Sequence, residues 1–196
     1  MARYAGRSWR NFQPRAAAVT AVAAPIRLVL RDCRVLGLDP GSQRTGYGVI
    51  DCKAEGERHI VSGCIDVTGQ DMVLRLQRIY RAVAELVQEH RPDVVAIERV
   101  FVHRNPDSAL KLGQARGVAL CAASSQGARV HEYAPRAIKI AITGYGAAAK
   151  PQVAQMVRNL LLLEAQLKAD AADALAVALC HSQTRRLGTL ADADVA

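Results

Sequence analysis

Apolar residues recur in two patterns along this chain, one typical of strands and one typical of helices. Short apolar runs at 35–39 and 93–100 have the length of buried strands. Between them, strands at about 46–52 and 58–66 are expected to form a short antiparallel meander. A helix is expected over about 70–90, because its apolar residues recur at helical spacing. The first half of the chain is therefore predicted to form three strands, a helix and a fourth strand.

The second half of the chain is predicted to be mainly helical. Helices are expected at about 106–125, 135–142, 151–163 and 170–183, with one further strand at about 129–133. Strands that alternate with helices in this way are typical of a three-layer α/β domain, in which helices flank a mixed sheet. A chain of 196 residues that is 51% hydrophobic is long enough for one such domain with its own core.

Positive charge is concentrated ahead of this patterned region. The net charge is +8, but residues 1–34 hold seven Arg and one acid, whereas 35–196 hold nineteen basic and seventeen acidic residues. We interpret 1–34 as a basic, disordered extension, 35–187 as the folded domain and 188–196 as a flexible tail. Residues 1–34 also have two other interpretations: a signal or transit segment, since an apolar stretch follows four arginines, and a start assigned too far upstream.

The remaining bulk features indicate a cytoplasmic protein. No apolar stretch reaches the roughly 18 residues of a membrane span, so no membrane association is expected. The five cysteines are widely spaced and form no CxxC pair. We expect them to be reduced and mostly buried, and neither a zinc site nor a disulfide framework is expected.

Four acidic residues stand at the ends of apolar segments, where acids are uncommon. Asp39 ends the first strand, Glu98 ends the apolar run at 94–98, and Asp170 and Asp173 begin the last helix. Asp39 alone fits a turn residue, and the two helical acids fit helix caps. Glu98 is harder to explain structurally, because Glu is a poor strand residue. Taken together, the four acids call for a functional explanation.

That explanation is metal binding. Residues three apart share a helix face, and open α/β sheets place their sites at the carboxyl ends of strands. The mutual repulsion of several carboxylates is relieved by a divalent cation, and an all-oxygen ligand set favours Mg²⁺ or Mn²⁺. Two such ions can activate water, bind a scissile phosphate and stabilise the leaving oxygen. The acids therefore predict a metal-dependent nuclease.

Several motifs resemble, in the same order, those of the RuvC family of crossover-junction endodeoxyribonucleases. They lie at 36–48, 96–101, 105–117 and 170–176, and the similarity extends over about 35–183. The resemblance implies a ribonuclease H-like three-layer fold with a mixed five-stranded sheet. It also implies a homodimer that resolves Holliday junctions in recombination and DNA repair, by paired, metal-dependent nicks in opposing strands of a four-way DNA junction. The RuvA-RuvB branch-migration complex is the further partner that it implies.

The same resemblance assigns roles to single residues. The implied metal ligands are Asp39, Glu98, Asp170 and Asp173, with two Mg²⁺ per subunit and Mn²⁺ as a substitute. Lys150 and Lys139 are implied to lie near the active site and contact DNA. From the residues alone, Lys150 fits a phosphate ligand beside a helix N-terminus and an ordinary solvated lysine equally well. Residues 1–34 depart from the family pattern, because members usually begin near the first strand.

Three further residues have two interpretations each. Phe101 follows the Glu98 strand and fits a core side chain, but the resemblance implies that it stacks on an unpaired base at the junction centre. Gly113 and Gly117 are four apart on one expected helix. The two glycines form a strip of small residues on this helix. The strip fits either packing within the chain or contact with a twin helix in a dimer, and the resemblance favours the dimer.

Two other classes of function fit parts of the pattern. Asp39-Pro40-Gly41 followed by Thr45-Gly46 is similar to the phosphate loop of actin-like ATPases and sugar kinases. Those proteins need a second lobe of similar size, which about 150 patterned residues cannot supply. A DNA-binding module without catalytic activity is the other class, and four intact acids argue against it.

Overall fold

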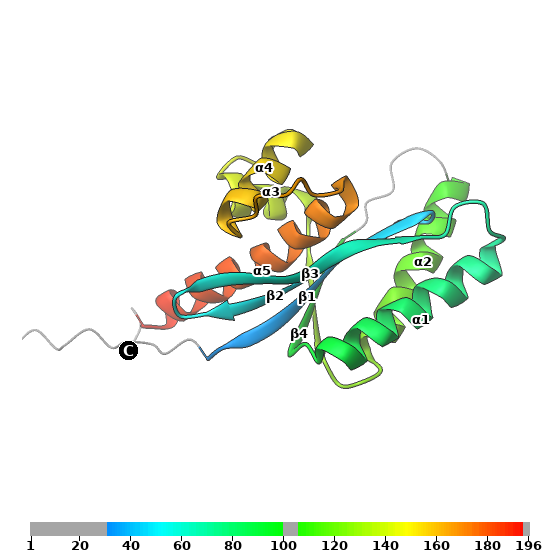
Figure 1. Ribbon diagram of the computed structural model, residues 1–196, viewed down its shortest axis with the longest axis horizontal. Helices are drawn as coiled ribbons and strands as arrows, with labels where there is room; N and C mark the ends of the chain where they lie inside the picture. The colour runs from blue at the N-terminus through cyan, green and yellow to red at the C-terminus, as the bar shows by residue number, and fades with distance from the viewer. Residues whose placement is uncertain (1–30, 100–105, 194–196) are drawn as a thin grey trace, which may run out of the picture.

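Within residues 31–99 and 106–193, which the computed structural model describes, five strands form one mixed sheet (Figure 1). The strands are β1 (Cys33–Asp39), β2 (Arg44–Lys53), β3 (Gly56–Asp66), β4 (Val94–Glu98) and β5 (Arg129–Tyr133). Their order across the sheet is β3-β2-β1-β4-β5. β2 runs antiparallel to β1 and β3, whereas β1, β4 and β5 run parallel to one another. The mixed five-stranded sheet expected from the sequence is confirmed.

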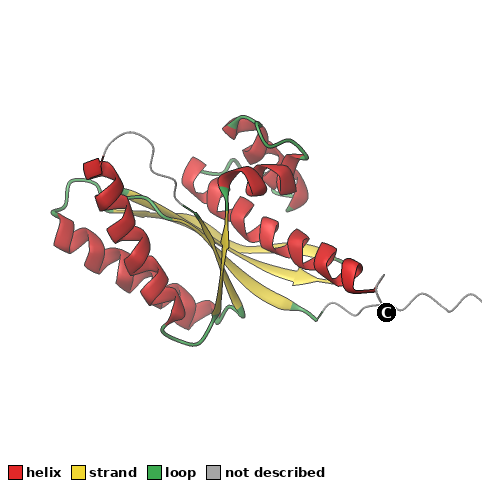
Figure 2. Cartoon of the chain, turned by 180° about the vertical axis from the view of Figure 1, so that it is seen from behind, coloured by secondary structure: helices red, strands yellow, loops and turns green. Residues whose placement is uncertain are grey.

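Helices cover both faces of this sheet. They are α1 (Met72–His90), α2 (Pro106–Ser124), α3 (Pro135–Thr143), α4 (Lys150–Leu160) and α5 (Ala169–Ala193). α1 and α2 lie together on one face, and α5 crosses the other face with α3 and α4 beside it (Figure 1 and Figure 2). Asp71 caps α1 by accepting a hydrogen bond from the Leu74 N–H at 3.0 Å. Pro135 and Pro151 stand in the first turns of α3 and α4, where a missing N–H costs little.

The side chains of β1 alternate between two hydrophobic cores. Val35 lies in the core beneath α3, α4 and α5, together with Val94 of β4. Leu36 and Leu38 lie in the core beneath α1 and α2, together with Val95. Successive residues of a strand point to opposite faces, and both faces of this sheet are covered. That is why β1 and β4 are continuous apolar runs rather than alternating ones.

Glycines on β1 and β2 let α5 approach the sheet closely. A Cβ atom at Gly37 would collide with the backbone oxygen of Ala174, and one at Gly46 would collide with the backbone oxygen of Asp170. Only glycine fits where two backbones come this close. The two positions therefore fix the first turns of α5, and with them Asp170 and Asp173, over the carboxyl end of β1.

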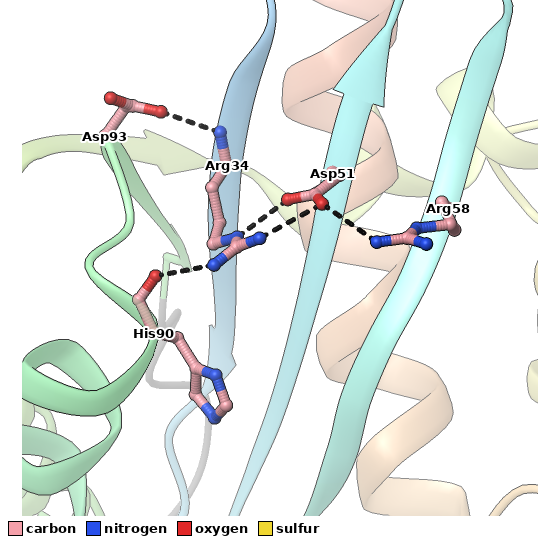
Figure 3. A network of polar contacts seen from close by, with 5 residues as sticks. All are labelled: Arg34, Asp51, Arg58, His90 and Asp93. Atoms are coloured by element: carbon pink, nitrogen blue, oxygen red, sulfur yellow. Dashed lines mark hydrogen bonds and ion pairs between the residues drawn. The ribbon is translucent and has the colours of Figure 1, made fainter.

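The sheet begins two residues before the expected domain boundary at residue 35, because Cys33 and Arg34 belong to β1. The Nε and Nη2 atoms of Arg34 donate to the two carboxylate oxygens of Asp51 at 2.7 and 3.1 Å. Asp51 also pairs with Arg58 at 3.6 Å (Figure 3). We call Arg34, Asp51 and Arg58 the ion-pair cluster. The basic, disordered extension expected over 1–34 is therefore wrong for Cys33 and Arg34. Their partners lie on a neighbouring strand, and pairing between strands leaves no periodic signal along the chain.

The last helix is longer than expected. α5 continues ten residues past the expected end at 183, so the flexible tail expected over 188–196 is helical as far as Ala193. Helix extension needs only local hydrogen bonds and residues of high helix propensity, such as Ala and Leu, and it requires no apolar periodicity. Arg186 holds this half of α5 by donating to the backbone oxygen of Lys53 at 2.9 Å. Across the described residues, no helix is long and apolar enough to cross a membrane.

Candidate active site

Parallel pairing brings the first two acids together. β1 and β4 are neighbours, and Leu38 lies opposite Ile97 in their ladder. Asp39 and Glu98 are the next residues of the two strands, so both stand at the same edge of the sheet. Their side chains are partly buried, and they are close enough for each to shift the pKa of the other.

Asp173 and Lys150 complete this group from the helical layer. Asp173 lies one turn into α5, and Lys150 is the first residue of α4. The Lys150 Nζ atom donates to Asp173 Oδ2 at 2.7 Å. We call Asp39, Glu98, Asp173 and Lys150 the carboxylate cluster. A small cavity opens beside it, and its lining residues are Glu98, Pro135, Ile138, Lys139, Lys150, Val153, Asp173 and Ala176.

The carboxylate cluster holds more negative charge than its cations offset. Burial raises the pKa of Asp39 to about 8, with further contributions from Glu98 and Asp173, while Lys150 opposes the shift. Burial also raises the pKa of Glu98, and Asp173 adds to this effect. The hydrogen bond to Asp173 raises the pKa of Lys150, which stays charged. The Asp39–Glu98 pair therefore retains a proton at neutral pH.

The donor atoms of this group suit a hard cation. They are carboxylate oxygens, the preferred ligands of Mg²⁺ and Mn²⁺. A proton and the Lys150 ammonium supply the positive charge at the cluster, and a divalent cation would supply more. Among the residues that the structure describes, no three His, Cys, Asp or Glu side chains are already gathered as a closed set of ligands. The fit to a metal therefore rests on the paired Asp39 and Glu98, with Asp173 close enough to act on both electrostatically.

Asp170 is not part of this group. Its carboxyl group lies beside the Cys64 thiol of β3 and raises the pKa of that thiol. Burial first and the neighbouring Asp170 second raise the pKa of Cys64 to about 11. A spacing of three residues separates two side chains by about 60° around a helix axis. Because α5 lies across several strands, that angle is enough to direct Asp170 and Asp173 toward different neighbours.

The other expected site residues divide into two groups. Lys139 of α3 lines the same cavity as Glu98, and its charge lowers the pKa of that carboxyl group. Phe101 lies outside the described residues. Arg116 of α2 was not among the expected site residues. Its Nε donates to the backbone oxygen of Glu98 at 3.4 Å, and its Nη2 pairs with Glu132 at 2.8 Å. The available signal was an arginine next to Ala115 on the buried face of α2.

A mixed sheet between helical layers, with acids at the ends of two parallel strands and in the helix packed across them, defines a ribonuclease H-like nuclease. The family model described as crossover junction endodeoxyribonuclease RuvC matches residues 35–181. The chain belongs to this family, and it is an endodeoxyribonuclease.

Individual relatives match most of the chain. A crossover junction endodeoxyribonuclease RuvC of Alkalilimnicola ehrlichii is 53% identical over 148 residues, which cover 76% of this chain and 90% of that protein. The protein of the same name from Dichelobacter nodosus is 52% identical over 159 residues, with 81% and 89% covered. The structure of Thermus thermophilus RuvC in complex with Holliday junction substrate superposes with a TM-score of 0.75 and 37% identity, over 80% of this chain and 97% of that one.

Proposed function

We propose that this protein resolves Holliday junctions in recombination and DNA repair by paired nicks in opposing strands. The observation that carries the proposal is the carboxylate cluster, which lies where the two parallel strands β1 and β4 end, on a fold similar to that of a RuvC bound to junction DNA. Nucleases of this family depend on a metal ion. The substrate class is thus a four-way DNA junction, and the reaction is hydrolysis of a phosphodiester bond.

The metal is Mg²⁺ in this proposal, with two ions per subunit and Mn²⁺ as a substitute. Asp39, Glu98 and Asp173 hold the metal from the carboxylate cluster, and Asp170 joins them once its side chain leaves Cys64. When bound, the metal activates the attacking water and stabilises the leaving oxygen. The raised pKa values of Asp39 and Glu98 support this assignment, because they mark a site short of positive charge.

The lysines act on the DNA strand. Lys150 is 78% exposed in its side chain, although its Nζ reaches Asp173. A cation bound by Asp173 would release this ammonium group for a phosphate oxygen, at the N-terminal end of α4. Lys139 stands beside the same cavity and neutralises phosphate in the same way. Phe101 stacks on an unpaired base at the junction centre, a role that rests on the family pattern alone.

The proposed assembly is a homodimer, because two symmetric active sites match the two equivalent strands of a junction. Gly113 and Gly117 are exposed on α2, and a Cβ atom added at either would meet nothing within 4 Å. Close packing within the chain therefore does not explain them, and Leu110 on the same face is 63% exposed. This face fits a twin helix. The RuvA-RuvB branch-migration complex as partner and a cytoplasmic location complete the proposal and rest on family membership.

A nicking assay tests the proposed function. A four-way junction and a linear duplex of the same sequence are incubated with the protein, with Mg²⁺ or with a chelator. Paired cuts in the junction, only with Mg²⁺, are expected. Equal cutting of the duplex, or cutting in chelator, would contradict the proposal. Glu98→Gln should abolish the cuts, whereas Glu85→Gln, an exposed glutamate on α1, serves as the matched control.

A further inference from the structure

Two cysteines face each other at the end of the sheet opposite the carboxylate cluster. Cys33 of β1 lies directly opposite Cys52 of β2 in the antiparallel ladder. Residues opposite each other in such a ladder have Cα atoms about 4.5 or 5.5 Å apart. Both values lie inside the range of about 4.4–6.8 Å that a disulfide spans. The two thiols are close enough for each to shift the pKa of the other.

This thiol pair is reachable from solvent. Cys33 is partly exposed, whereas Cys52 is 4% exposed. Both residues line an open cavity of about 360 Å³, whose walls also carry Arg34, Asp51 and Asp93. A small polar reagent can therefore reach Cys33 first, with Cys52 directly behind it.

The two sulfur atoms are unequal in acidity. The neighbouring Cys52 thiol lowers the pKa of Cys33 to about 7, although burial opposes this, and Arg185 and Arg129 add to the lowering. The neighbouring Cys33, together with burial, raises the pKa of Cys52. Cys33 is therefore the more acidic of the two, and its thiolate is the nucleophilic form. Cys52 remains a thiol that can attack a sulfur oxidised on its neighbour.

We propose that Cys33 and Cys52 form a redox-active dithiol, which a peroxide converts to an intramolecular disulfide. The Cys33 thiolate attacks one oxygen of hydrogen peroxide, the O–O bond breaks, and hydroxide leaves. The resulting sulfenic acid is attacked by the Cys52 sulfur, which gives up its proton, and a water molecule leaves as the S–S bond forms. Two thiols thus give two electrons to one peroxide, and two water molecules result. A thiol reductant reverses the change.

The other cysteines do not share this arrangement. Burial raises the pKa of Cys180 to about 11. Burial and the neighbouring Asp170 raise the pKa of Cys64 to about 11 as well. Cys121 is exposed on α2, away from the sheet. Selective oxidation is therefore expected at the cross-strand pair, with Cys121 as the residue that tests selectivity.

The disulfide would close a ring over residues 33–52, the hairpin that carries Asp39. Closing a ring restricts the unfolded chain, so the oxidised protein should unfold at a higher temperature. Six residues of extended strand place Cys33 about 20 Å from Asp39. The rate of DNA cutting should therefore stay the same, and the proposal stands independently of the function proposed above.

The experiment uses the full chain with Cys121→Ser as background, to prevent cross-linking between molecules. Protein is treated with hydrogen peroxide at neutral pH, remaining thiols are blocked, and peptides are mapped without reduction. We expect a linked pair of peptides containing Cys33 and Cys52, lighter by two hydrogen atoms. A rise in Tm of about 5–10 °C, reversed by a thiol reductant, should accompany it. Cys33→Ser and Cys52→Ser should each show neither change, whereas Cys64→Ser should behave like the background.

The mapping of the background protein decides the question even if a serine variant fails to fold. A disulfide that joins Cys33 to Cys52 supports the proposal. Peroxide treatment that leaves both thiols free, or that drives Cys33 to sulfinic acid without a link to Cys52, overturns it. A disulfide that involves Cys64 or Cys180 instead would overturn it as well.

Discussion

The two ends of β1 carry charged groups of opposite character. At one end, the ion-pair cluster surrounds Asp51 with two guanidinium groups, and the bond from Arg34 lowers the pKa of that acid. At the other end, the carboxylate cluster leaves Asp39 with a pKa raised to about 8. Asp51 lies on β2, where two arginines pair with it, whereas Asp39 ends β1 in a more buried position beside two other acids. An acid that is paired with arginines links neighbouring strands, whereas acids with too little positive charge around them favour the binding of a cation.

The geometry of the ion-pair cluster shows what a purely structural role requires. Arg34 contacts both oxygens of Asp51 and also donates from Nη1 to the backbone oxygen of His90 at 3.1 Å (Figure 3). Its own N–H donates to Asp93 at 2.7 Å. One side chain therefore links β1, β2 and the end of α1. Such bidentate, multiply bonded pairs are among the stronger ionic contacts in proteins.

The largest effect is expected from removing charge at the carboxylate cluster. Asp39→Asn should lower the rate of junction cutting by about 10²–10³-fold, because an oxygen proposed to bind the metal is replaced by an amide. Binding to the junction should persist, since the lysines remain. Gel-shift and nicking assays on one preparation measure the two properties. Asp66→Asn, an exposed acid on β3, is the control, and a rate near wild type for Asp39→Asn would remove that residue from the site.

Lys150 should have a smaller effect on cutting. Lys150→Ala is expected to slow cutting by about 10–100-fold, because one charge proposed to bind phosphate is lost while the carboxylates stay. It should also weaken the dependence of junction binding on salt, which follows the number of phosphate contacts. Salt titrations of binding, with Lys53→Ala as the exposed control, measure this. An unchanged salt dependence together with an unchanged rate would make Lys150 an ordinary surface lysine.

Stability should respond in opposite directions at the two ends. Asp51→Asn should cost about 1–2 kcal/mol, because it leaves the Arg34 guanidinium without its partner. Asp39→Asn should instead stabilise the metal-free protein at pH 7 by about 1 kcal/mol or more, because folding no longer has to protonate this carboxyl group. Thermal unfolding in chelator at matched pH compares them. Destabilisation by both changes would erase the distinction between the clusters.

The pH dependence separates the same two acids further. The pKa of Asp39 is raised from 3.8 to about 8, so the folded state binds the extra proton, and this acid lowers stability as pH rises from about 4 to 8. The pKa of Asp51 is lowered, so its stabilisation is complete above 3.8 and is lost as pH falls through its folded value. Asp39→Asn should flatten the first dependence, and Asp51→Asn the second, in unfolding curves without metal.

Truncation at the N-terminus locates the domain boundary, and its shorter form gives the smallest expected effect. Removing residues 1–30 should leave stability unchanged, because β1 keeps all its residues. Removing 1–34 should cost about 1–2 kcal/mol, because Asp51 loses the two hydrogen bonds from Arg34 and keeps only the longer contact with Arg58. Chemical denaturation of both truncated chains tests this. Equal stability would mean that the Arg34 contacts contribute nothing measurable.

Sequence patterns predicted those parts of the molecule whose apolar residues recur at regular spacing along the chain. Apolar runs revealed β1 and β4, and parallel pairing then placed Asp39 beside Glu98 at one edge. The different directions of Asp170 and Asp173 could not be predicted, because they depend on how α5 lies across the sheet. That placement depends in turn on the glycines at Gly37 and Gly46, whose role appears only when the helix is in position.

Contacts between distant strands were the other part that the sequence did not reveal. The pairs Arg34–Asp51 and Cys33–Cys52 follow from the register of β1 against β2, which a one-residue slip would destroy. Composition alone placed Cys33 and Arg34 in a basic extension. Their fixed partners show that they belong to the folded domain.

The most direct test of the difference between the two clusters is a Mn²⁺ titration followed by electron paramagnetic resonance, which separates free from bound ions. It would compare the wild-type protein with Asp39→Asn and Asp51→Asn. Wild type and Asp51→Asn are expected to bind Mn²⁺ alike, and Asp39→Asn is expected to lose most of this binding. Full Mn²⁺ binding by Asp39→Asn would contradict the assignment of the carboxylate cluster as the metal site.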